Sequence, residues 1–137
     1  SLIANYWGQN RVYHHTAPIN MTYALYRALL LILEEGPEKV FKRHLDNHLL
    51  LVKGLEAMGL KMVVETPWRL PMLNTVYCPE GIDELAARRR LRSEFKIEIG
   101  GGLGPLAGKI WRIGLMGHTA RKENVERFLD ALRKVIA

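Results

Sequence analysis

The spacing of apolar residues changes once along the chain, near residue 60, and this change limits the folds that are possible. Between residues 20 and 59 apolar residues recur every three or four positions, which is the spacing of one helix face. Beyond residue 60, short runs rich in valine, isoleucine and tyrosine alternate with proline and glycine, as strands and turns do. We therefore expect two helices followed by a region that mixes strands and helices.

The first predicted helix covers residues 20–35, with Asn20 as its N-cap and Gly36 closing it. Its apolar positions exceed one stripe, because Leu30 and Leu31 widen the apolar surface beyond that of an ordinary surface helix. We expect this helix to be buried on several sides, for example against a second subunit.

The remaining elements are predicted from the positions of proline and glycine and from the helical or strand spacing of apolar residues. Pro37 is suited to the first turn of a second helix that ends at Gly59. Strands are expected at 60–65, 73–77, 96–99 and 109–115, with helices over 82–95 and after Thr119. This order favours an α+β domain, in which helices cover one face of a small, mostly antiparallel sheet.

The net charge of +6 and the pI of 9.7 raise the question of a nucleic-acid partner. The densest basic run, residues 88–92, lies in a predicted helix whose apolar face is formed by Leu85, Ala86, Leu91 and Phe95, so its arginines are expected to face water. No aromatic residues interleave with this run to stack bases. We expect no nucleic-acid partner, although a non-catalytic basic interaction module remains the alternative outside enzymes.

Membrane and redox signals point to a soluble protein of the cytoplasm. The longest strongly apolar run, residues 28–33, is far shorter than the roughly 20 residues that cross a bilayer. Cys78 is the single cysteine and cannot form an internal disulfide, which suits a reducing compartment. Because the sequence opens at Ser1 without a methionine, we expect it to be part of a longer protein.

The glycine-rich residues 100–105 invite nucleotide-binding interpretations that fail in detail. The pattern Gly-x-Gly-x-x-Ala at 102–107 is followed by a predicted strand, whereas a dinucleotide site requires a helix there. Residues 104–109 have one residue too few between the glycines for a P-loop. Two interpretations stay open, a turn that allows close approach of backbone and a loop bordering a ligand pocket.

His44 and His48 are four residues apart on one helix face, the spacing at which two imidazoles can bind one metal ion. No third ligand accompanies them, so we expect packed, hydrogen-bonded histidines and no metal site. Cys78 has no neighbour in the sequence that would lower its pKa, and we expect it to be unreactive.

Two further groups could bind anions. Arg112 alternates with Trp111 and Ile113 along a predicted strand, beside Gly114, which leaves room for a planar carboxylate that guanidinium binds with two hydrogen bonds. An internal salt bridge is the alternative. Residues 13–16, Tyr-His-His-Thr, precede a helix and could bind phosphate, or could serve only in capping and surface hydrogen bonds.

Four segments, taken in order, resemble the C-terminal part of the class V aminotransferases, in the alanine–glyoxylate and serine–pyruvate branch. They are Asn-Tyr-Trp-Gly at 5–8, Tyr-His-His-Thr-Ala-Pro at 13–18, Glu-Ile-Gly-Gly-Gly-Leu-Gly-Pro at 98–105 and Trp-Arg-Ile-Gly-Leu-Met-Gly at 111–117. The resemblance spans the whole chain. It implies residues 1–20 as an interface and cofactor-phosphate loop, and 21–137 as the small C-terminal domain of a fold-type-I enzyme that uses pyridoxal 5'-phosphate (PLP).

The resemblance also implies residue roles. Tyr13 and Thr16 would contact the cofactor phosphate of the neighbouring subunit in a homodimer, and Arg112 would bind the substrate α-carboxylate. The substrates would be a small amino acid, alanine or serine, and a 2-oxo acid, glyoxylate or pyruvate.

The family's catalytic lysine follows a Ser-x-Ser-Gln segment in a large domain, and neither that segment nor the large domain is present here. We therefore expect no catalytic residue in this chain and no activity from it alone. Another class V enzyme, such as a cysteine desulfurase, is the alternative within the class. It is disfavoured because Cys78 lies before the predicted helix at 82–95 and outside the glycine-rich loop.

Overall fold

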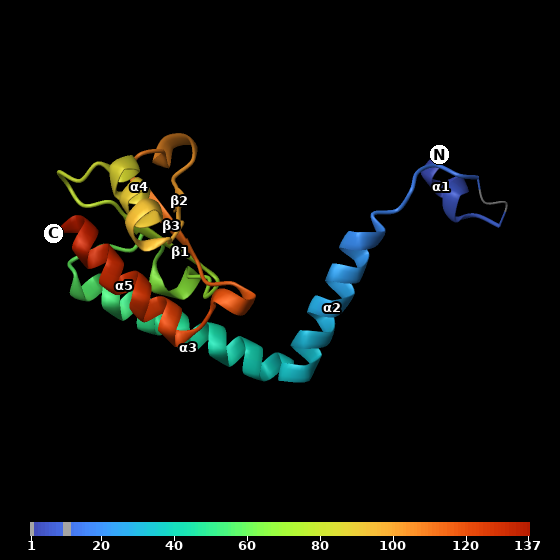
Figure 1. Ribbon diagram of the computed structural model, residues 1–137, viewed down its shortest axis with the longest axis horizontal. Helices are drawn as coiled ribbons and strands as arrows, with labels where there is room; N and C mark the ends of the chain where they lie inside the picture. Colours follow the sequence, from blue (N-terminus) through green and yellow to red (C-terminus); the bar gives the residue numbers. More distant parts are fainter. Residues whose placement is uncertain (1, 10–11) are drawn as a thin grey trace. The chain divides into compact units, whose positions relative to one another are not determined.

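The computed structural model describes residues 2–9 and 12–137, so that Ser1, Asn10 and Arg11 lie outside the described residues. The chain divides into two units, Ser1–Pro37 and Glu38–Ala137, which are drawn in Figure 1.

The first unit contains the helices α1 (Leu2–Trp7) and α2 (Ile19–Glu35). The start of α2 differs from expectation, because Asn20 lies inside the helix and Pro18 precedes its first residue. The Pro18 carbonyl accepts hydrogen bonds from both the backbone N–H and the hydroxyl of Thr22, at 3.0 and 3.1 Å. Gly36 closes the helix as predicted, with a φ of 91° that suits glycine.

The apolar surface of α2 is exposed among the described residues of the first unit. No residue of the helix is buried, and Leu25 and Leu33 are 59% and 67% exposed. The burial expected on several sides is therefore not provided by the described residues of the first unit.

The second unit is an α+β domain, as predicted. Its elements are α3 (Pro37–Ala57), β1 (Leu73–Tyr77), α4 (Glu84–Phe95), β2 (Gly100–Gly101), β3 (Ile110–Gly114) and α5 (Lys122–Ile136), with short 3₁₀ turns at Thr66–Trp68, Gly104–Leu106 and Gly117–Thr119. The sheet is antiparallel in the order β1-β3-β2, so β3 is its central strand. None of the helices in the described part of the chain is long and apolar enough to cross a bilayer.

Two predicted strands are shorter than expected or displaced. The segment 60–65 contributes only one bridge, from Met62 to Val76, before a 3₁₀ turn begins at Thr66. The strand expected at 96–99 starts instead at Gly100. Lys96 takes a left-handed conformation to close α4, and the N–H of Ile97 then bonds to the Leu91 carbonyl at the helix end.

The core lies between the sheet and α3, α4 and α5. Trp111 of β3 is completely buried there, and α5 contributes Val125, Phe128, Leu129, Leu132 and Val135. The buried face of α4 differs in part from the predicted one, and α3 buries only part of its apolar residues. On α4 the buried residues are Glu84, Ala87 and Leu91, while Leu85 and Ala86 are exposed; on α3 the core takes Val52 and Leu55 and leaves Phe41 and Leu45 exposed.

Candidate functional site

Arg112 lies at the centre of the sheet, on the face opposite the core. Along β3 the neighbours Trp111 and Ile113 are buried, Arg112 is half-buried and Gly114 is exposed. The alternation predicted from the sequence is therefore confirmed.

The strands on both sides of β3 frame the guanidinium. Thr75 of β1 and Gly100 of β2 stand opposite Arg112 in the two ladders. A Cβ added to Gly100 would lie 3.4 Å from both Nε and Nη2 of Arg112, so the guanidinium rests against the bare backbone of that glycine. The Nε–H donates a hydrogen bond to the Gly101 carbonyl at 2.7 Å.

The internal salt bridge that was the alternative for Arg112 is not found in residues 2–9 and 12–137, since no carboxylate there pairs with its guanidinium. Its two terminal nitrogens also have no protein acceptor in the same residues. They can therefore form the two parallel hydrogen bonds by which guanidinium holds a carboxylate.

The glycine-rich segment borders Arg112 and makes a close backbone approach. A Cβ on Gly102 would overlap the Leu106 carbonyl, so a side chain does not fit at this position. After the 3₁₀ turn at Gly104–Leu106 the chain enters β3 and not a helix. The predicted strand is thereby confirmed at the place where a dinucleotide site would require a helix N-terminus for the pyrophosphate.

The hydroxyls of Tyr13 and Thr16, in the first unit, lie 2.8 Å apart and are hydrogen-bonded to each other. Both residues are exposed. Next to them the Nδ1 atoms of His14 and His15 are 2.8 Å apart, and the ring of His15 stacks on Tyr6 at 5.2 Å between centroids. The loop thus presents two adjacent hydroxyls that one phosphate group could contact together.

Both histidines considered as metal ligands are hydrogen-bonded instead. Nδ1 of His44 donates to the Val40 carbonyl at 2.7 Å, and its Nε2 accepts from the Gly117 N–H at 3.0 Å. Nδ1 of His48, which is buried, lies 2.6 Å from Oδ1 of Asn74. Among the residues with assigned positions, no group of three potential ligands could hold a metal.

Cys78 has the properties of an unreactive thiol. Burial raises its pKa, and the nearby carboxylates of Glu84 and Asp83 raise it further. Its Sγ donates to the Ile82 carbonyl at 3.4 Å.

The basic run of α4 is paired with acidic residues. Arg90 binds Glu94 at 3.0 Å, and both side chains are about half exposed. Arg88 differs, because it contacts the buried carboxylate of Glu84 through two nitrogens and lies directly behind Gly101. We had not singled out this pair, although a glutamate four residues before an arginine on a helix is a recognisable signal.

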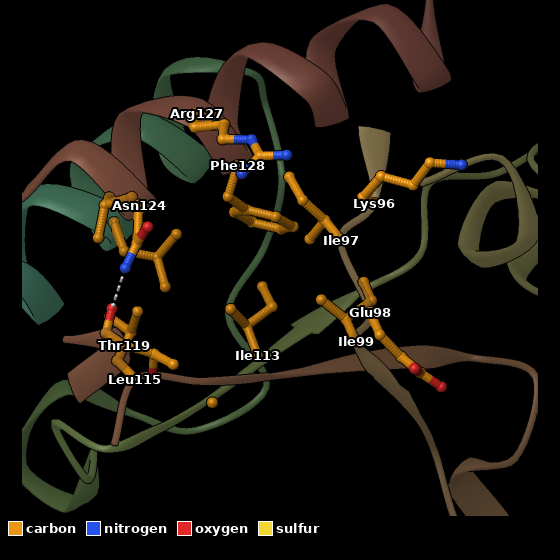
Figure 2. A pocket seen from close by; sticks show the side chains of 13 residues that line it. Lys96, Ile97, Glu98, Ile99, Ile113, Leu115, Thr119, Asn124, Arg127 and Phe128 are labelled. Carbon is orange, nitrogen blue, oxygen red and sulfur yellow. Dashed lines mark hydrogen bonds between the residues drawn. The ribbon is translucent and has the colours of Figure 1, made fainter. Parts of the chain in front are cut away.

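A pocket of about 240 Å³ opens between α5, the segment 96–99 and the end of β3 (Figure 2). Phe128, Ile97 and Ile113 point toward its centre, Thr119 and Asn124 also line it, and Lys96 and Glu98 lie at its edge. Arg112 does not line it, so this pocket is separate from the proposed carboxylate site.

No family model matches the chain. It is 43% identical over 136 residues to a (S)-ureidoglycine–glyoxylate transaminase of Bacillus subtilis, covering 99% of this chain and 33% of that protein. It is 43% identical over 138 residues to an alanine–glyoxylate aminotransferase of Callithrix jacchus, covering 98% and 33%. A solved alanine–glyoxylate aminotransferase from Nostoc sp. superposes with a TM-score of 0.90 at 52% identity, covering 99% of this chain and 36% of that structure.

The chain therefore spans about a third of the length of the curated relatives that it matches. The small antiparallel sheet with its helices has the same fold as the corresponding part of the solved aminotransferase. Over nearly every residue the chain thus matches about a third of these aminotransferases in sequence and in structure, which confirms the predicted resemblance to the class V aminotransferases.

Proposed function

We propose that the complete protein containing this chain is a PLP-dependent aminotransferase that moves an amino group between a small amino acid and a 2-oxo acid. Alanine or serine is the proposed donor, and glyoxylate or pyruvate the proposed acceptor. The names of the relatives support this choice, since the transaminase of Bacillus subtilis and the aminotransferase of Callithrix jacchus both include glyoxylate in their names.

The observation that carries the proposal is the hydrogen bonding of the Arg112 guanidinium. Its Nε is engaged by the Gly101 carbonyl, its terminal nitrogens have no acceptor among the described residues, and Gly100 beside it has no side chain. Amino acids and 2-oxo acids share a carboxylate attached to the reacting carbon. One guanidinium can therefore position both substrates in turn, and so place the reacting carbon against the cofactor.

The hydroxyls of Tyr13 and Thr16 fit a phosphate, because they are exposed and 2.8 Å apart. When bound, PLP supplies the electron sink that the chemistry of amino-group transfer requires. We propose that the two hydroxyls donate hydrogen bonds to the cofactor phosphate held by the neighbouring subunit of a homodimer. The uncovered apolar surface of α2 supports an extensive contact of this kind, since isolated soluble chains seldom expose such a surface. The catalytic lysine would come from a part of the protein outside this chain.

The test is to replace Arg112 in the complete enzyme. Arg112→Lys keeps the charge but loses the bidentate hydrogen bonding to the carboxylate, so kcat/KM for alanine and glyoxylate should fall about 10- to 1000-fold. Arg112→Leu should lower it further. Neither change should much affect kcat/KM for ethylamine, which is alanine without its carboxylate, because this quantity describes only the half-reaction with the amine and not the one with the 2-oxo acid.

Arg133→Lys is the matched control, because Arg133 is an exposed arginine of α5 paired with Asp130. It should leave all rates unchanged. An equal loss for ethylamine and alanine in the Arg112 variants, or thermal unfolding that falls in step with activity, would show that Arg112 has a structural role and not a substrate-binding one.

A further inference from the structure

We propose that the ion pair of Glu84 and Arg88 is a positioning element for Arg112, acting through the carbonyl of Gly101. The inference rests on the proposed function, because it gives the pair a role in binding the substrate carboxylate. Neither residue would touch substrate.

The first link joins Arg112 to Gly101. The hydrogen bond from Nε to the Gly101 carbonyl, at 2.7 Å, is the polar contact that holds the guanidinium within the described residues. Because guanidinium is planar, holding Nε sets the direction of the edge that carries the two terminal nitrogens. The position of the Gly101 carbonyl therefore determines where a carboxylate is bound.

The second link joins Gly101 to the ion pair. A Cβ added to Gly101 would lie 2.9 Å from Oε1 of Glu84 and 3.0 Å from Nη2 of Arg88, so the backbone of Gly101 rests directly on the pair. β2 consists of only Gly100–Gly101, and a strand this short has few ladder bonds of its own to hold it in place. The pair therefore packs against the residue whose carbonyl binds Arg112.

The pair is itself well held. Arg88 donates from Nε to Oε1 of Glu84 and from Nη2 to Oε2, the latter at 3.2 Å, and the Glu84 side chain is only 7% exposed. The hydrogen bond with Glu84 raises the pKa of Arg88, so the guanidinium stays charged. Asp83 caps the first turn of α4, accepting from the backbone N–H groups of Leu85 and Ala86 at 2.9 and 3.0 Å.

A further contact ties the pair to the strand that carries Arg112. Nε1 of Trp111 donates to the Glu84 carbonyl at 3.4 Å, and Trp111 is the residue before Arg112 on β3. The first turn of α4 is thus connected both to β3 and to β2. Weakening the pair should let Gly101 shift and leave Arg112 less well oriented, with the reacting groups themselves unchanged.

The experiment compares Glu84→Gln with Glu94→Gln in the complete enzyme. Glu94 forms the same type of pair with Arg90 on the exposed side of α4, so it is a matched control without contact to Gly101. Glu84→Gln should raise KM for alanine and glyoxylate, and the inhibition constant of acetate, about 3- to 10-fold, with kcat nearly unchanged. Kinetics with ethylamine should not change. Arg88→Lys, which keeps the charge but not the two-pronged contact, should have a smaller effect than Arg88→Met.

The outcomes separate this inference from the proposed function. If Arg112→Lys impairs alanine selectively while Glu84→Gln leaves KM and acetate inhibition unchanged, the positioning role is wrong and the proposed function stands. If Glu84→Gln impairs ethylamine and alanine equally, the pair is merely structural and the inference is overturned. If Arg112→Lys has no selective effect, the proposed function fails first, and the inference fails with it.

Discussion

Replacing Gly54 by alanine should destabilise the second unit, although alanine is the better helix former. Gly54 lies in the last turn of α3, facing Leu129 of α5. A Cβ at this position would overlap Cδ1 of Leu129 and lie 2.7 Å from its Cδ2. Carbon atoms in contact prefer separations of about 3.5–4.0 Å, so Leu129 would have to move.

Two opposing terms set the magnitude. Alanine in a helix interior is favoured over glycine by about 1 kcal/mol. Forcing one extra methyl into a packed core costs about 1–3 kcal/mol. The overlap involves both methyls of Leu129, which is only 8% exposed and has little space to enter, so the cost should be near the upper end. We expect a net loss of about 1–2 kcal/mol in the free energy of unfolding.

A double-mutant cycle tests this reasoning, because the effect of Gly54→Ala on stability should change sign when Leu129 is removed. Leu129→Ala alone should cost about 2–5 kcal/mol, because it leaves a cavity. In that background Gly54→Ala should become stabilising, by about 1 kcal/mol, since the added methyl enters free space and only the helix preference remains. Urea unfolding followed by circular dichroism measures all four variants. A stabilising Gly54→Ala in the unmodified chain would refute the proposed contact.

Two further predictions concern the first unit and the thiol. In the complete enzyme, replacing both Tyr13→Phe and Thr16→Ala should weaken PLP binding by about 1–3 kcal/mol without unfolding the protein. In mixed dimers of variant and unmodified subunits, the defect should lie in the site of the neighbouring subunit. An unchanged PLP dissociation constant would contradict the phosphate contact. Because burial and nearby carboxylates raise the pKa of Cys78, iodoacetamide should alkylate it more slowly at pH 8 in the folded than in the urea-unfolded chain, and the alkylation rate should reach its plateau at a higher pH in the folded chain. Equal rates at pH 8 would argue against this burial.

Features that depend only on neighbouring residues could be predicted from the sequence. Gly36 ends α2 with a positive φ, and Pro37 opens α3, because these conformations are properties of the residues themselves. The alternation along β3 likewise follows from the period of a strand, so the outward position of Arg112 could be predicted without the fold. The succession of motifs was sufficient to indicate the family.

Tertiary structure alone decided the extent of the strands and the surroundings of Arg112. The segment 96–99 has the composition of a strand, yet the closure of α4 at Lys96 turns it away from the ladder. The contact of Gly101 with Arg112 and with the Glu84–Arg88 pair depends on the register of β2 against β3 and on the packing of α4 behind it. Such contacts join residues that are distant in sequence, and no local preference of the chain encodes them.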